Sequence, residues 1–509
     1  MKKLLAILIT INCFAQAPTI EWQKSFGGSD LDNGANIKQT NDGGYIAVGA
    51  TKSNDAILLQ GNYHGSFDVY VIKMNDAGTI EWQKTIGGSG YEVGTSVIQT
   101  QDNGYIISGY TSSNDGDFTL NHGLFDCFVV KLDVLGNIIW QKTYGGSQND
   151  ESFALIQTNE GGYLMAGTSQ SNDGQVAQNK GVLDGWIVKL DASGSIEWEK
   201  TYGGTNTEYI NSILQIADND YVFVGHTYSN DGDVTQNQGN CDAWIVKINA
   251  IGTIEWQKTY GGSEVDFLYT IQQSPDGGYL TCGQTESSNG NVTTNRGLTD
   301  SWVLKLNAIG GIEWNKTYGG SNDDSLNSII QTQNGDYIMQ GNSYSNDFDV
   351  AANYGGSDGW IIKLTDTGDF IWQKNLGGTD NDGINAILKT ADNGFSCVGC
   401  TYSNNGDVTL NHGSSDLWIV KLSPESLATS TFQQDKLTVF PSPTTNLLHL
   451  QTPNDFAIDT IIVTDSTGKT ILQKNRNMNQ INTQNLAPGI YFLQATANNK
   501  TYQTKFIKN

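Results

Sequence analysis

The stretch "IEWQKTYGGS" at residues 254–263 occurs, with small changes, seven times in this chain of 509 residues. Its tryptophan returns at Trp22, Trp82, Trp140, Trp198, Trp256, Trp314 and Trp372. The first interval is 60 residues and the other five are 58. A fixed period of this length indicates a repeat architecture, in which each unit buries its apolar faces against its neighbours.

Each unit contains four strand-like runs. In one unit these are "SIIQT" (328–332), "YIMQG" (337–341), "WIIKL" (360–364) and "FIWQK" (370–374). The joints are rich in Gly, Asn and Asp, which tolerate tight turns and positive φ. We predict a four-stranded antiparallel meander, with strands a, b, c and d counted from the inside outward. The long b–c loop and the d–a connection then emerge at the same end.

The two ends of the repeat region are out of phase. It begins on a d strand (20–26) and ends on a c strand (416–422), so one unit is split between the chain's ends. In a closed ring of sheets, strands from the two ends of the repeat region complete one shared unit. A solenoid instead needs atypical capping repeats at its ends. We therefore predict an all-β protein with a seven-bladed β-propeller over 18–422, closed by pairing of 20–26 with 416–422.

The unit resembles the β-propeller repeats of secreted and surface proteins of bacteria. Its strand order also resembles kelch repeats, with "GGYI" (43–46) on strand b and Trp on strand d. The resemblance covers 18–422 and implies the propeller fold, but these families have no single function.

The charge is strongly acidic, at −25 for the whole chain. Residues 18–422 hold 19 of the 28 basic and 48 of the 53 acidic side chains. Such a surface repels nucleic acid and anionic membranes, so neither is expected as a partner.

The N-terminus "MKKLLAILITINCFAQA" (1–17) is typical of a signal peptide, with cleavage after Ala15 or Ala17. No later segment is apolar enough to span a membrane as a helix. After a linker at 423–436, the repeat stops and tryptophan disappears. Residues 437–509 show alternating strands that predict a small β-sandwich.

The tail contains "VFPSPTTNLLHL", "VTDSTGKTI" and "NLAPGIYFLQATANNKTYQTKFIKN". These phrases resemble the type A C-terminal sorting domain of the Bacteroidota type IX secretion system. The resemblance implies Sec export, passage across the outer membrane through the type IX machinery, and release or attachment at the cell surface.

Two acidic positions recur in every unit. The first follows Gly-Gly in the d–a connection: Asp32, Glu92, Asp150, Glu208, Asp266, Asp324 and Asp382. The second ends the b–c loop: Asp68, Asp126, Asp184, Asp242, Asp300, Asp358 and Asp416. Aspartate accepts backbone N–H bonds and fixes turns, which is the structural interpretation. The functional interpretation makes the first set part of a binding face.

Calcium is a second functional hypothesis. The "NDGD" loops at 114–117 and 230–233 offer clustered oxygen ligands, with Asp115, Asp117, Asp231 and Asp233 as candidates. Several other loops carry Asn or Gln at these positions, and the full EF-hand pattern is absent. No other cofactor is expected.

Catalysis requires residues that break the repeat, and few do. His64, His122 and His412 share one loop position, and His226 stands beside a strand-b glycine. A three-histidine metal site is not expected, because equivalent loops on successive blades lie far apart. The sequence favours a secreted, non-enzymatic binding or adhesion protein for a glycan or protein. The alternative is a secreted polysaccharide hydrolase or lyase built on a propeller.

Overall fold

The computed structural model describes residues 15–55, 64–332, 334–427, 437–452, 457–475, 479–497 and 500–509. Most of the predicted signal peptide and residues 428–436 of the predicted linker lie outside these ranges. The described chain separates into a compact unit over Ala15–Ser426 and a C-terminal unit that starts at Leu427. The all-β class predicted from the sequence is confirmed.

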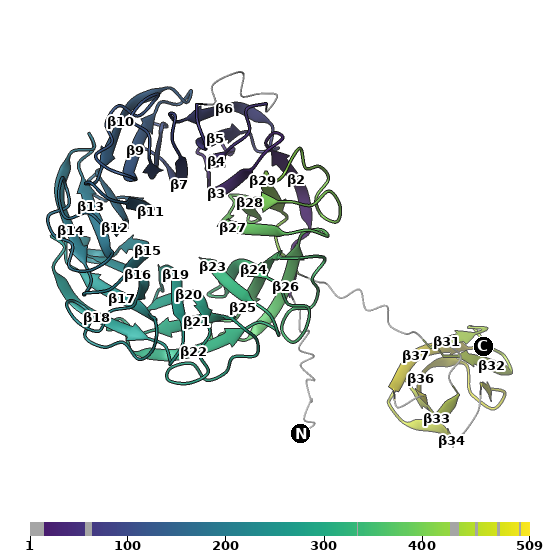
Figure 1. Cartoon of the computed structure of the whole chain (residues 1–509). Helices are drawn as coiled ribbons and strands as arrows, with labels where there is room; N and C mark the ends of the chain where they lie inside the picture. Colours follow the sequence, from purple (N-terminus) through teal and green to yellow (C-terminus); the bar gives the residue numbers. More distant parts are fainter. Residues whose placement is uncertain are drawn as a thin grey trace. The chain divides into compact units, whose positions relative to one another are not determined.

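The larger unit contains seven four-stranded antiparallel sheets, arranged around a centre in Figure 1. The innermost strands (a) are β3 Asp32–Gln39, β7 Glu92–Gln99, β11 Asp150–Gln157, β15 Glu208–Gln215, β19 Asp266–Gln273, β23 Asp324–Gln331 and β27 Asp382–Lys389. Strands b are β4 Tyr45–Thr51, β8 Tyr105–Thr111, β12 Tyr163–Ser169, β16 Tyr221–Thr227, β20 Tyr279–Thr285, β24 Tyr337–Ser343 and β28 Phe395–Thr401.

Strands c are β5 Asp68–Met74, β9 Asp126–Leu132, β13 Asp184–Leu190, β17 Asp242–Ile248, β21 Asp300–Leu306, β25 Asp358–Leu364 and β29 Asp416–Leu422. Strands d are β2 Ile20–Phe26, β6 Ile80–Ile86, β10 Ile138–Tyr144, β14 Ile196–Tyr202, β18 Ile254–Tyr260, β22 Ile312–Tyr318 and β26 Phe370–Leu376. One 3₁₀ turn, η1 Ala217–Asn219, joins β15 to β16.

The split sheet has the order β2-β29-β28-β27. Strand β2 pairs with β29 in antiparallel register, from Ile20 opposite Leu422 to Phe26 opposite Leu417. The first and last strands of the repeat region thus belong to one sheet, as the phase of the sequence predicts.

The hydrophobic core lies between sheets. Each of seven buried clusters takes residues from two consecutive sheets. We call the interface between two consecutive sheets a seam, and the interface between the split sheet and the first sheet the closing seam. The cluster at the closing seam contains Tyr45 and Tyr70 of the first sheet and Val398 and Leu417 of the split sheet. A single blade buries only part of its faces, so its neighbours supply much of its stability.

The repeated phrase places its side chains at these seams. Next to a c–d turn of the following blade, the Trp256 ring lies against Gly310, where an added Cβ would be 3.2 Å from its Cζ3. The Tyr260 hydroxyl donates to the Gly310 carbonyl at 2.5 Å. Within its own blade, Gln257 Oε1 accepts the indole N–H of Trp244 at 2.9 Å. Trp and Tyr therefore bind the next blade, while Gln satisfies a buried tryptophan.

The glutamate of the phrase pairs with a lysine on strand c. Glu255 lies 2.6 Å from Lys247, and Glu81 lies 2.7 Å from the buried Lys73. Lys73 also contacts Asp42 in the a–b turn, so it links three strands at the short-turn end of its blade.

The c-strand tryptophans are fully buried: Trp186, Trp244, Trp302, Trp360 and Trp418. In the second sheet Phe128 takes this place, and the loop residue that packs there is Phe118, with ring centroids 5.0 Å apart. The equivalent loop residues beside the tryptophans are all buried valines: Val176, Val234, Val292, Val350 and Val408. A larger loop residue fills the volume that the smaller ring leaves, as close packing requires.

The propeller extends beyond its predicted boundary. The two-residue strand β1 Ala15–Gln16 pairs with β30 Ser426–Leu427, but β1 lies within the predicted signal peptide, and cleavage after Ala15 or Ala17 removes at least Ala15. Glu425 accepts the indole N–H of Trp372 at 2.8 Å and pairs with the buried Lys363. The start of the predicted linker 423–436 therefore belongs to the propeller. Because no c–d turn follows β29, Glu425 supplies the contact that a turn makes elsewhere.

The C-terminal unit consists of two sheets around its own core. One sheet has the order β31-β32-β35, with β31 Thr438–Phe440, β32 Leu447–Gln451 and β35 Gln480–Asn482. The other has the order β34-β33-β36-β37, with β33 Ile458–Asp465, β34 Thr470–Asn475, β36 Gly489–Ala497 and β37 Lys500–Lys508. Strand β35 is too short to show a sequence pattern and was not predicted. Among the described residues, no helix is long and apolar enough to cross a membrane.

One seam has a defect that can be repaired. Asn315 replaces the glutamine of the phrase in β22, and both its Oδ1 and the indole N–H of Trp302 are buried without a hydrogen-bond partner. Asn315→Gln adds the missing methylene, so we expect it to stabilise the protein by about 0.5–1.5 kcal/mol. Gln257→Asn is the matched reverse change and should destabilise by about 1–3 kcal/mol. Denaturant unfolding of both variants measures these changes in the free energy of unfolding. A change of the same sign in both variants would contradict the prediction.

Candidate functional site

The turn that connects one blade to the next is the most elaborate feature of the loop-bearing end. At five of the seven turns, a parallel bridge joins the residue before strand c of one blade to the residue before strand a of the next, as Phe67 does with Tyr91. The Glu92 N–H donates to the Phe67 carbonyl at 2.9 Å. The two acidic residues that follow these positions, Asp68 and Glu92, are therefore brought together although 24 residues separate them.

The first acidic set fixes this turn from inside. Asp266 Oδ2 accepts the Gly262 N–H and the Ser287 hydroxyl, each at 2.8 Å. Equivalent bonds from the second glycine of the Gly-Gly pair reach every member of the set. All seven are at most 1% exposed: Asp32, Glu92, Asp150, Glu208, Asp266, Asp324 and Asp382. Backbone N–H and hydroxyl donors hold these side chains inside the protein, which favours the structural interpretation over a place on a binding face.

The second acidic set is equally buried but only half satisfied. Asp242 Oδ2 accepts the Gln238 N–H at 2.8 Å. The other carboxylate oxygen, Oδ1, is buried without a hydrogen-bond partner in all seven members: Asp68, Asp126, Asp184, Asp242, Asp300, Asp358 and Asp416.

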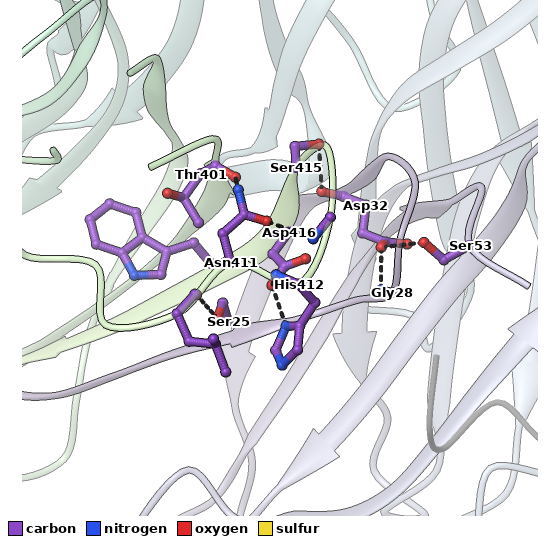
Figure 2. A network of polar contacts seen from close by, with 12 residues as sticks. Ser25, Gly28, Asp32, Ser53, Thr401, Asn411, His412, Ser415 and Asp416 are labelled. Carbon is purple, nitrogen blue, oxygen red and sulfur yellow. Dashed lines mark hydrogen bonds and ion pairs between the residues drawn. The ribbon is translucent and has the colours of Figure 1, made fainter. Parts of the chain in front are cut away.

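Members of the two sets face each other across the first glycine of the turn. A Cβ added at Gly261 would lie 2.5 Å from Asp266 Oδ2 and 2.8 Å from Asp242 Oδ1. The same arrangement occurs at each of the seven turns, so only glycine fits there. Figure 2 shows the closing seam, where Asp32 accepts bonds from Gly28 and Ser53, and Asp416 is bound by His412.

Burial changes the acidity of these pairs. It raises the pKa of five second-set aspartates to about 6, and the nearby first-set carboxylate adds to the shift: Asp68, Asp184, Asp242, Asp300 and Asp358. Burial also raises the pKa of Asp32, Asp126, Asp150, Asp266 and Asp324. Every one of the seven pairs thus contains a carboxyl group whose pKa is raised by burial.

The pH dependence of stability follows from this shift. Asp184 has a pKa of about 6 when folded and a reference value of 3.8, so the folded state binds more protons between these values. We expect the melting temperature to fall as the pH rises from about 4 to about 7. Asp184→Asn mimics the protonated form and should raise the melting temperature at pH 7 by about 1–3 °C, with no gain at pH 4.

Asp76→Asn provides the control, because it removes one negative charge from an exposed position. Equal effects of the two substitutions at pH 7 would show that general charge repulsion, rather than the buried pair, produces the pH dependence.

The three histidines of the b–c loops do not come together. His64, His122 and His412 each place Nδ1 against the second-set aspartate of their own blade: Asp68, Asp126 and Asp416. Within the described ranges, no group of three or more His, Cys, Asp or Glu side chains is arranged to hold a metal ion.

A cavity of about 470 Å³ lies beside His412 at the closing seam, with Phe26 and Tyr70 in its wall.

The calcium candidates bind backbone N–H groups of the same turns. Asp231 Oδ1 accepts the Thr205 N–H at 2.7 Å, and Asp233 Oδ2 accepts the Gly203 N–H at 3.1 Å. Asp115 and Asp117 make the equivalent bonds to Ser89 and Gly87. Amide oxygens make these bonds in other blades: Gln175, Asn289, Asn291 and Asn405. The positions require an oxygen acceptor, which a neutral side chain also provides.

Calcium binding at 114–117 and 230–233 stays a prediction with a direct test. Bound calcium would raise the melting temperature in proportion to the logarithm of its concentration above Kd, and excess chelator would lower it. The double variant Asp231→Asn, Asp233→Asn should lose part of this response. Midpoints that are the same with chelator and with added calcium would remove the metal hypothesis.

The sevenfold pattern breaks on the inner strands, at the end that carries the long loops. Phe153 and Tyr209 stack with ring centroids 6.3 Å apart, and Tyr209 stacks on His226 at 4.6 Å and 18°. His226 contacts Phe267 at 4.1 Å. We call Phe153, Tyr209, His226 and Phe267 the aromatic row. It spans the third, fourth and fifth sheets, and its members from β11, β15 and β19 are only half-buried.

A second aromatic group lies in the first two blades. Tyr91 contacts Phe67 at 4.8 Å and Phe125 at 6.0 Å, and Tyr110 contacts Phe125 at 5.6 Å. All four side chains are half-buried. Sequence reasoning noted His226 as an outlier but missed both groups. Comparing the repeats position by position reveals the row, because most other units carry non-aromatic residues at these positions; the exceptions are Tyr110, at the position of His226, and Tyr269, at the position of Phe153.

Comparison with known proteins places the tail. A family model described as "Secretion system C-terminal sorting domain" matches residues 438–509. The chain therefore carries a type IX secretion sorting domain and is exported to the cell surface or extracellular space.

Relatives of the repeat region are distant. Regulatory protein FlaEY of Caulobacter vibrioides is 21% identical over 282 residues, which are 49% of this chain and 29% of that protein. An uncharacterized WD repeat-containing protein, L264, of Acanthamoeba polyphaga mimivirus is 28% identical over 145 residues, 25% of this chain and 10% of that one. The chain spans less than a third of the length of either relative.

Two solved structures give a similar picture. PorZ, a surface component of the type IX secretion system of Porphyromonas gingivalis, matches with a TM-score of 0.38 at 12% identity, over 95% of this chain and 60% of that one. The WD40 domain of Neurospora crassa Pan2 matches with a TM-score of 0.43 at 11% identity, over 78% and 95%. Likenesses this weak say nothing about function.

Proposed function

We propose that this secreted protein is a non-enzymatic binding or adhesion module that holds an extracellular glycan or protein at the loop-bearing end of its propeller. The observation that carries the proposal is the aromatic row. Positions repeated in all seven blades serve the fold, whereas the row occurs once and leaves aromatic surface partly accessible. Aromatic side chains supply large, rigid contact area at binding sites.

The repeated polar groups do not favour catalysis. The seven carboxylate pairs are buried, and the loop histidines are each bound to an aspartate of their own blade. These groups stabilise turns, and a dissolved substrate does not reach the carboxylates.

A polysaccharide hydrolase or lyase is the second candidate, and one observation favours it. The negative charge of Glu151 contributes to the raised pKa of Tyr209, and that of Glu286 contributes to the raised pKa of Tyr228. The ring centroids of Tyr228 and His226 are 6.2 Å apart. Burial raises the pKa of both glutamates. Glycoside hydrolysis requires two carboxyl groups that flank the scissile bond, and Glu151 and Glu286 are the candidates for these roles.

One screen separates these functions. The purified secreted protein is incubated with a panel of polysaccharides and surface proteins, and both retention on the ligand and release of soluble products are measured. The proposal expects retention without product. Product release that disappears in Glu151→Gln or Glu286→Gln would establish the enzyme instead, and absence of both signals across the panel would contradict both functions.

A further inference from the structure

We infer that the ligand of the aromatic row is an uncharged carbohydrate chain, whose sugar rings lie against Tyr209 and Phe267. This inference rests on the proposed function and names its ligand class. It follows from where the row departs from sevenfold symmetry, how its rings are held, and which charges surround it.

The row occupies positions that the fold leaves free to vary. Tyr209 and Phe267 are second residues of inner strands, next to an invariant acid. In the other blades this position holds Asn33, Val93, Glu151, Ser325 and Gly383. Because the fold accepts residues from glycine to glutamate there, two adjacent aromatic residues are not a requirement of the propeller.

The rings are held in place before a ligand arrives. Tyr209 and His226 are paired residues of β15 and β16, and their rings are nearly parallel. Asn211 donates to the Leu268 carbonyl at 2.7 Å and lies 3.5 Å from His226 Nδ1, which ties the fourth blade to the fifth. A surface that is already ordered loses little side-chain entropy on binding.

The row carries no charge of its own. Burial lowers the pKa of His226 to about 3, so its ring is neutral at any pH near neutrality. Tyr209 contacts Phe153 and His226, and Phe267 contacts His226 and Tyr269, so the part of these half-buried rings that stays exposed is the apolar surface offered to the C–H face of a sugar.

The negative charge around the aromatic row favours uncharged sugars over acidic ones. Residues 18–422 carry a large excess of acidic groups, and Glu151 acts on both Tyr209 and Tyr110. Acidic polysaccharides are repelled by this field. Glu151 can accept hydrogen bonds from sugar hydroxyls, which a purely apolar partner does not offer. Apolar rings with an acceptor beside them, in a negative field, fit a neutral sugar chain.

The test uses the full-length secreted protein and four probes: a soluble β-glucan, a mannan, anionic alginate and an aromatic-rich peptide. We expect binding of at least one neutral polysaccharide and none of alginate. Tyr209→Ser and Phe267→Ser introduce the residue that the sixth blade carries at the same position, Ser325. Each should weaken binding by about tenfold or more. Ser325→Ala is the matched control and should leave affinity unchanged.

The outcomes distinguish this inference from the proposed function. Binding of a neutral polysaccharide that neither serine variant weakens would overturn the inference while leaving the proposed function intact. Preference for alginate or for the peptide would overturn it too. No binding to any of the four probes would overturn the inference, and no retention across the wider panel of polysaccharides and surface proteins would overturn the proposed function as well. Should the variants melt early, a ligand-induced change in the tyrosine absorption of the unmodified protein gives a second readout, and its absence on binding would contradict the inference.

Discussion

Burial between neighbouring sheets is the constraint on which this propeller depends. The core clusters each draw on two consecutive sheets, so no blade is complete without the next. The repeated phrase "IEWQKTYGGS" supplies the side chains that meet this requirement. Its Trp and Tyr reach the following blade, its Gln satisfies an indole within its own blade, and its glycines form the connecting turn. Seven copies exist because seven seams must each be formed.

The connecting turn carries an electrostatic penalty that the chain accepts at every seam. Two carboxyl groups meet across a glycine, and at least one oxygen of each pair is buried without a hydrogen-bond partner. A buried charge is costly unless it is paired or neutralised. Burial accordingly raises the pKa of a carboxyl group in each pair, so that this group binds a proton at a higher pH than a free aspartate does. Lysines at the opposite end of the blade show the contrast, because Lys131 lowers the pKa of Asp102 to about 2 through an ion pair.

The sequence revealed the fold more fully than the site, for physical reasons. Strand periodicity and the phase of the repeat predicted the residues of β2 and β29 and their pairing, since alternation and turn chemistry are local signals. The burial of Asp266 and Asp242 was not predicted, because acidic side chains are usually exposed and their meeting depends on a bridge between blades. The pairing of β1 with β30 was also missed, since two residues show no period. The aromatic row was missed because its members come from three repeats and meet only in space.

The split sheet also orders events during synthesis. Strand β2 is made first among the repeat strands, yet its partner β29 follows almost 400 residues later. Until that partner appears, the outer strand of the last blade has nothing to pair with, and the first and last seams stay open. The sorting domain follows directly after. Consequently, a chain truncated before β29 lacks both the partner of β2 and the sorting domain. A chain that contains the sorting domain has already synthesised every strand of the propeller.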